Sequence, residues 1–219
     1  MKHHLVLIVF AALLVLTVLD SCLGISAEIT LGRNGSGTIR LEYRLAGELE
    51  SLGKLDGNEG RPSIPVGRTD FERTAARIPG LTLKSFSSAA EGNDAVYRAA
   101  LAFTDTDALL RFLDASGQKA SLSQENGRNR LSLTLADGGG AVESGLGELV
   151  SSVSRGYFLT LSFSLPSETE ITLTDETGRP IDPPQGWNLA GGRRPSFSAP
   201  IGEVLLFERP LHLETVWGF

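Results

Sequence analysis

The sequence predicts an α+β domain, in which successive hairpins form an antiparallel sheet and about three helices pack on one face of it. Polar and apolar residues alternate in many short segments, which is the pattern of half-buried strands. Pairs of these segments flank turns rich in Gly and Asn. After an opening hairpin, helix, strand, turn and strand recur about three times. Because hairpins pair antiparallel and alternating strands need one covered face, a single sheet with helices on one side is the economical arrangement.

The opening hairpin joins residues 25–31 to residues 38–45, and both segments alternate strictly between apolar and polar side chains. The connection between them contains Asn34-Gly35, two residue types that adopt positive φ angles at little cost. Further strand pairs are expected at 81–86 with 95–103, at 119–123 with 130–135 and at 158–165 with 170–174. The sheet face away from the helices is expected to be rich in Ser and Thr, as at Thr160 and Ser162, and to meet water or a polar partner.

Three helices are expected between these hairpins. Residues 69–78 begin with capping-box spacing and are followed by Pro and Gly. A second helix is expected from Asp105 to Ala115, and Asp105 and Asp107 are interpreted as its capping residues rather than as a metal-binding pair. Apolar residues at helical spacing predict a third helix over 142–153, either a plain core helix or a weakly held lid over an apolar space.

We expect the folded chain to divide into an α+β domain at residues 22–174 and a β extension at residues 175–219 that packs on the same domain. The extension is crowded with Pro and Gly. Within it we expect a hairpin around Gly191-Gly192 and strands at 204–207 and 211–217. Trp187, with Arg193 and Arg194 close by, is a candidate contact for a partner, because Trp and Arg are enriched at binding hot spots. A buried structural Trp187 is the alternative.

Composition and motifs exclude several classes of function. The formal net charge of −6 at pH 7 makes nucleic acid a poor partner. The chain has one Cys and three His, of which His3 and His4 lie in the first segment, so neither a zinc site nor another cofactor is expected. His212 and Glu214 share a strand face and could hold a general base with its carboxylate, but an exposed pair on an edge strand is the favoured interpretation. We therefore expect no catalytic residue and no enzymatic activity.

The first 22 residues predict export. Lys2 supplies a positive charge, and Leu5 to Leu19 form an apolar run that is shorter than the roughly 20 residues of a membrane-spanning helix. Residues 1–21 are therefore interpreted as a signal peptide. Its end, Leu19-Asp20-Ser21-Cys22, resembles the bacterial lipobox. That resemblance implies that Cys22 becomes the lipid-modified N-terminus and holds the protein at a membrane of the cell envelope, on the periplasmic or surface side.

A lone thiol fits lipidation, because a disulfide needs a pair of Cys residues. Asp20 occupies a position where a small or apolar residue is usual. A cut after Gly24 or Ser26 by the general signal peptidase, which would leave a soluble exported domain, is therefore the alternative.

This leader, followed by the first strand and the Gly35-Ser36-Gly37-Thr38 turn, resembles the N-terminal part of the LppM-like bacterial lipoproteins. The resemblance implies an α+β domain displayed at the envelope, with lipid binding in some members. We therefore expect an anchored lipoprotein with a non-enzymatic binding role toward an apolar ligand, a lipid or a protein partner. Two alternatives remain: a structural or assembly factor of the envelope, and an envelope hydrolase that uses carboxylates.

Overall fold

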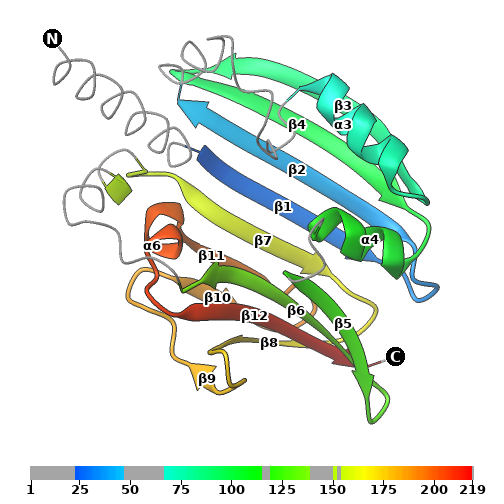
Figure 1. Ribbon diagram of the computed structural model, residues 1–219, viewed down its shortest axis with the longest axis vertical. Helices are drawn as coiled ribbons and strands as arrows, with labels where there is room; N and C mark the ends of the chain where they lie inside the picture. Colours follow the sequence, from blue (N-terminus) through cyan, green and yellow to red (C-terminus); the bar gives the residue numbers. More distant parts are fainter. Residues whose placement is uncertain (1–22, 47–66, 115–118, 139–149, 152–153, 219) are drawn as a thin grey trace, which may run out of the picture.

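The computed structural model describes residues 23–46, 67–114, 119–138, 150–151 and 154–218. In these ranges twelve strands form two sheets (Figure 1). Sheet A has seven strands in the order β10-β11-β7-β1-β2-β4-β3, and sheet B has five in the order β5-β6-β12-β8-β9. Strands account for 56% of the structure and helices for 16%, so the protein is mainly β.

The bounds of the elements are as follows. Sheet A is built from β1 (Leu23–Leu31), β2 (Gly37–Ala46), β3 (Leu81–Glu91), β4 (Asp94–Phe103), β7 (Phe158–Ser164), β10 (Asn188–Ala190) and β11 (Ser196–Pro200). Sheet B is built from β5 (Ala120–Glu125), β6 (Arg128–Asp137), β8 (Thr169–Thr174), β9 (Pro180–Ile181) and β12 (Pro210–Gly218). The described helices are α3 (Arg68–Arg77), α4 (Thr106–Leu113) and α6 (Ile201–Leu205).

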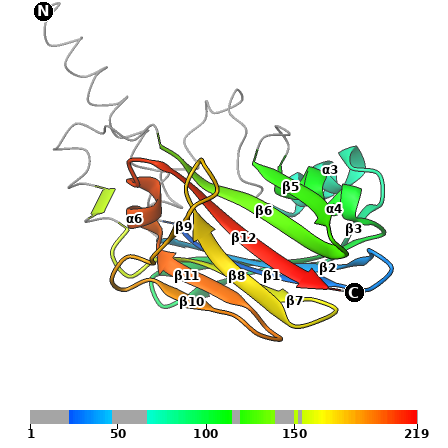
Figure 2. The same ribbon diagram turned by 90° about the horizontal axis from the view of Figure 1, so that it is seen from below.

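Sheet B and the helices α3 and α4 all lie on the same face of sheet A, as Figure 2 shows. Alternate residues of the central strands of sheet A, such as Ile39 and Leu101, are fully buried in one hydrophobic core with Leu213 of sheet B. On α3, Phe71 is fully buried, and its ring packs 6.2 Å from Tyr43 and 5.8 Å from Phe86, measured between ring centroids. The apolar face of sheet A is thus covered partly by a second sheet and partly by helices.

The predicted arrangement of one antiparallel sheet covered by about three helices was therefore wrong. The described helices are only ten, eight and five residues long, too short to cover a seven-stranded face. Packing two sheets face to face buries an apolar face of each at once. Strands β7 and β8 were expected to pair with each other, but they belong to different sheets. β7 instead pairs with β1, and in parallel, with Ile25 opposite Leu159.

Most local predictions are confirmed. The hairpins β1–β2, β3–β4, β5–β6 and β10–β11 all form. The side chain of Asp105 caps α4 by accepting a hydrogen bond of 2.8 Å from the backbone N–H of Ala108. Helix α3 begins one residue earlier than expected, and the carboxylate of Asp70 accepts from the N–H of Gly67 at 3.3 Å. The expected helix over 142–153 falls largely outside the described residues.

The C-terminal residues contain one wrong prediction and two long-range pairings. Residues 204–207 were expected to form a strand, but the chain is helical from Ile201 to Leu205. Short apolar runs of this kind do not distinguish the two states by periodicity. Strand β11 pairs with β7, and β12 lies between β6 and β8. The Pro/Gly-rich segment therefore contributes to both sheets.

Tyr43 gives this core a measurable pH dependence. Burial raises the pKa of Tyr43 to about 12, whereas an unfolded tyrosine ionises near pH 10. The unfolded state therefore loses its proton first as the pH rises, and folding stability should fall by up to about 3 kcal/mol through this window. Tyr43→Phe removes the group, so its free energy of unfolding, measured with urea between about pH 9 and about pH 11.5, should fall less steeply than that of the natural protein. Equal slopes would show that Tyr43 is accessible to solvent.

Candidate functional site

The outer face of sheet A, meaning the side turned away from sheet B and from α3 and α4, carries the polar residues of alternate strand positions. Glu28 of β1, Arg40 and Glu42 of β2 and Arg98 of β4 are on this face, while neighbours such as Ala27 are buried. In Figure 2 sheet B and the two helices lie above sheet A, and no described element covers the face below. Thr160 of β7, expected on this wet face, lies there and contacts the Ser198 hydroxyl at 3.1 Å.

Two arginines and two glutamates form a closed ring of ion pairs on this face. Arg98 bonds Glu42 at 2.7 Å and Glu91 at 2.8 Å. Arg44 bonds the same two carboxylates, at 2.8 Å and 3.1 Å. The hydrogen bond from Arg98 is the main cause that lowers the pKa of Glu91. Since all four side chains are between 29% and 41% exposed, water screens these pairs, and they determine the charge pattern more than the stability.

A separate pair extends the pattern along the sheet. Glu28 and Arg40 are cross-strand partners in β1 and β2, and their side chains are 3.1 Å apart. Together with the ring, this pair gives three arginines and three glutamates whose charges balance, and Asp94 at the start of β4 adds one more carboxylate to the same face.

Two adjoining hollows on the outer face form what we call the outer groove. The larger has a volume of about 410 Å³ and is lined by Ser26, Glu28, Arg40, Glu42, Ser85, Ser87 and Arg98, among others. The smaller has a volume of about 190 Å³ and is lined by Gly24, Ser26, Glu42, Arg44, Tyr157, Phe158 and Thr160, among others. Ser26 and Glu42 line both hollows, so the two hollows are adjacent.

Tyr157 crosses the strands at one end of the outer groove. Its hydroxyl donates to the Asp94 carboxylate at 2.8 Å, which links the start of β7 to the start of β4. A Cβ on residue 24 would lie 3.3 Å from Tyr157 Cδ1, closer than most real contacts, so the glycine lets the ring lie close over β1. The groove is thus bounded at this end by an aromatic side chain in a fixed position.

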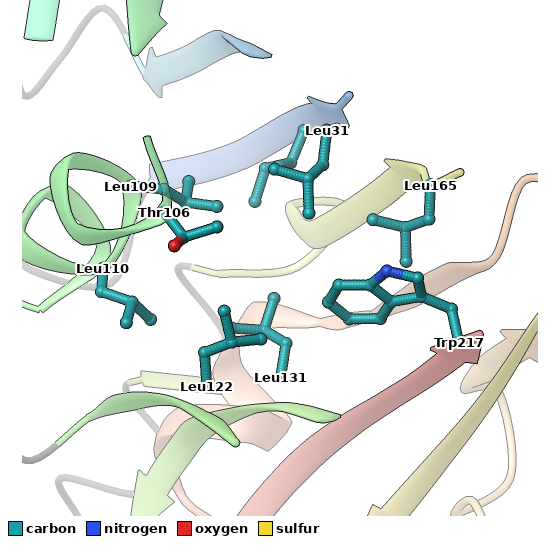
Figure 3. Close-up of a pocket in the computed structure, with 9 residues that line it drawn as sticks. Leu31, Thr106, Leu109, Leu110, Leu122, Leu131, Leu165 and Trp217 are labelled. Carbon is teal, nitrogen blue, oxygen red and sulfur yellow. The ribbon is translucent and has the colours of Figure 1, made fainter. Parts of the chain in front are cut away.

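Between the two sheets lies a small apolar cavity. Figure 3 shows Leu31, Leu109 and Leu110 on one side of it and Leu122, Leu131 and Trp217 on the other. Its volume is about 10 Å³, which at most equals the space that one water molecule needs. The apolar space that a binding role toward a lipid requires is therefore not provided by this cavity.

Trp187 lies in the core, and Arg193 and Arg194 are exposed. The Trp187 ring packs edge-on against Phe197 at 5.7 Å and lies 5.8 Å from Phe207, and its Nε1–H donates to Glu203 at 2.6 Å. These contacts agree with the structural alternative for Trp187. A partner contact at this loop stays a prediction that rests on the two arginines.

The His212–Glu214 pair does not form a catalytic dyad. His212 Nδ1 lies 3.1 Å from the Thr134 hydroxyl, and Glu214 forms an ion pair with Arg130 instead. The strand that carries both, β12, is central in sheet B rather than an edge strand, contrary to the expectation.

Asp114 is the buried acid of the described residues. Its carboxylate accepts hydrogen bonds from the backbone N–H groups of Lys119 and Ala120 and so connects the end of α4 to β5. In the described ranges no cluster of three or more His, Cys, Asp or Glu residues could hold a metal ion. Nor does any helix there have the length and apolar character to cross a membrane. Cys22 lies outside the described residues, directly before β1.

No protein-family model matches the chain, and no curated protein matches it. The resemblance to LppM-like lipoproteins therefore stays a prediction from the sequence.

Truncating Trp187 distinguishes a core role from a surface role. Trp187→Ala should lower the free energy of unfolding by about 3 to 5 kcal/mol, because it leaves a cavity beside Phe197 and Phe207. Trp187→Phe keeps most of the ring packing and should cost less. The control Arg193→Ala, at an exposed position, should stay within about 0.5 kcal/mol of the natural protein. Urea unfolding followed by circular dichroism measures all three, and a near-neutral Trp187→Ala would contradict the core assignment.

Proposed function

We propose that the protein is an exported bacterial lipoprotein, held at the cell envelope through Cys22, that binds a protein partner over the outer face of sheet A and catalyses no reaction. The observation that supports this proposal best is the outer groove, two adjoining hollows on a sheet face that no described element covers.

The charge pattern of the outer groove favours a protein over a small ion or a nucleic acid. Each of its arginines is already paired with a glutamate, so a phosphate or another anion would meet carboxylates as well as guanidinium groups. A protein surface carries both signs and can exchange ion pairs with this pattern, and such complementarity gives specificity and faster association. Arg is also enriched at protein interfaces.

The size of the face supports the same partner class. Seven strands spaced about 4.8 Å apart give a surface about 29 Å wide. Its longer strands, β1 to β4, have nine to eleven residues and so extend about 30 to 37 Å, while β10 and β11 are shorter. The area of the face is therefore comparable with the roughly 800 Å² that each partner buries in a standard interface. The interior cavity of about 10 Å³ gives no comparable support to an apolar ligand.

The anchor is tested by intact-mass measurement. Protein purified from its native membranes should carry a diacyl or triacyl mass on Cys22, and Cys22→Ala should lack that mass. The reason is that the pattern from Leu19 to Cys22 predicts a lipid attached to the Cys22 side chain through a thioether bond. An unmodified chain that begins after Gly24 or Ser26 would remove the anchor from the proposal.

The binding face is tested by photo-crosslinking in cells of the native organism. A photoreactive amino acid at Ser87, which is exposed and lines the outer groove, should crosslink to a discrete protein partner. The matched control is Ser123 on β5, an exposed serine of sheet B. Arg98→Glu places a third acid beside Glu42 and Glu91 and should reduce the Ser87 crosslink several-fold while leaving the mass at Cys22 unchanged. Equal crosslinking at Ser87 and Ser123 would contradict the proposed face.

A further inference from the structure

Sheet A begins directly after the predicted lipid attachment. Strand β1 starts at Leu23, one residue after Cys22, so no linker separates the two. Consecutive Cα atoms are about 3.8 Å apart, so the residue that follows the lipid-bearing Cys22 already belongs to sheet A. The start of β1 is therefore the part of the domain nearest to a membrane that holds Cys22.

Three other elements reach the same end of the molecule. Strand β7 runs parallel to β1 and begins opposite its start, and β11 ends there, with Pro200 opposite Phe158. Helix α6 follows at once, and the N–H of Ile201 donates to the carbonyl of Tyr157 at 3.0 Å. Both views show α6 near the start of β7, at the left end of the molecule (Figures 1 and 2).

The exposed large hydrophobic side chains of the described residues are Phe158, at 45% exposure, and Leu205, at 48%. Phe158 is the first residue of β7 and Leu205 is the last residue of α6, so both belong to this same end. A single exposed hydrophobic residue needs no explanation. Two exposed hydrophobic residues on adjoining elements, beside the predicted anchor, do need an explanation.

We propose that this end of the domain, which we call the anchor end and define by Phe158 and Leu205, rests on the lipid bilayer with both side chains in the interfacial region. The inference deepens the proposed function, because it rests on a lipid at Cys22. The interface of a bilayer accepts apolar side chains that would otherwise meet water.

The charges near the anchor end indicate which lipids it would contact. Arg155 and Glu203 are both exposed and flank the two hydrophobic residues in sequence, so neither sign dominates. Contact should therefore depend on apolar burial rather than on anionic headgroups, which fits a chain with a net charge of −6.

Such a contact would fix the orientation of the outer groove. Phe158 lines the smaller hollow of the groove, so that hollow would lie next to the headgroups. The larger hollow, between Glu28 and Arg98, would face sideways and stay open to a partner on the membrane surface.

The test measures how close individual residues come to the lipid. The mature acylated protein carries no free thiol once Cys22 is a thioether, because the chain has one Cys. Single cysteines introduced as Phe158→Cys, Leu205→Cys and Arg33→Cys can therefore be labelled selectively with a fluorophore. Arg33 is the control, because it is exposed in the β1–β2 turn, at the far end of β1. In phosphatidylcholine vesicles with a quencher on the acyl chains, quenching at 158 and 205 should exceed that at 33 several-fold.

Each outcome decides between the two proposals. Acylated protein with equal quenching at the three positions overturns the membrane contact and leaves the anchor intact. Protein whose mass shows no acyl chain overturns the anchor and the contact with it. If a labelled variant fails to fold, hydrogen exchange of the unlabelled lipoprotein replaces it: vesicles should slow exchange around residues 157–160 and 203–207 and not around 32–36, and uniform exchange would overturn the contact.

Discussion

The apolar face of sheet A is the constraint on which the rest of the structure depends. Its central strands bury one row of side chains each, including Ile39 and Leu101, and this row must be removed from water along seven strands. Sheet B supplies the larger part of the cover, and Phe71 of α3 closes the part near β3. Among the described residues all the cover lies on one side, and no described element lies over the polar residues of the other side.

Most of the local structure of this chain could be predicted from its sequence, whereas the assignment of strands to the two sheets could not. Alternation correctly indicated the hairpins and the buried rows, and Asp105 was recognisable as a helix cap. Alternation does not indicate which element covers a buried row of side chains. The apolar face of one hairpin can be covered by another hairpin as well as by a helix. The parallel pairing of β7 with β1 has no local signal, because it depends on contacts between Ile25 and Leu159 that lie far apart in the chain.

The candidate site shows the same division. The alternation of Arg40, Glu42 and Arg44 predicted a wet face, but the ring of ion pairs needs Glu91 and Arg98, which only the register of β2, β3 and β4 brings close. The sequence alone allowed Trp187 to be either exposed at the surface or buried in the core. The fold decides its position, because Phe197 and Phe207 enclose the ring and Glu203 accepts its N–H.

The central position of β1 has a consequence for the order of folding. Strand β1 is the first of the described strands to be synthesised, yet it lies between β2 and β7, and β7 follows about 130 residues later. Local pairing with β2 can form early, but the other edge of β1 must wait, with its hydrogen-bonding groups unpaired, until β7 is available. Closure across so long a segment is slow relative to hairpin formation. A chain that emerges gradually from its N-terminus would therefore pair both edges of β1 only after Ser164, and it would complete sheet A only after β11 ends at Pro200.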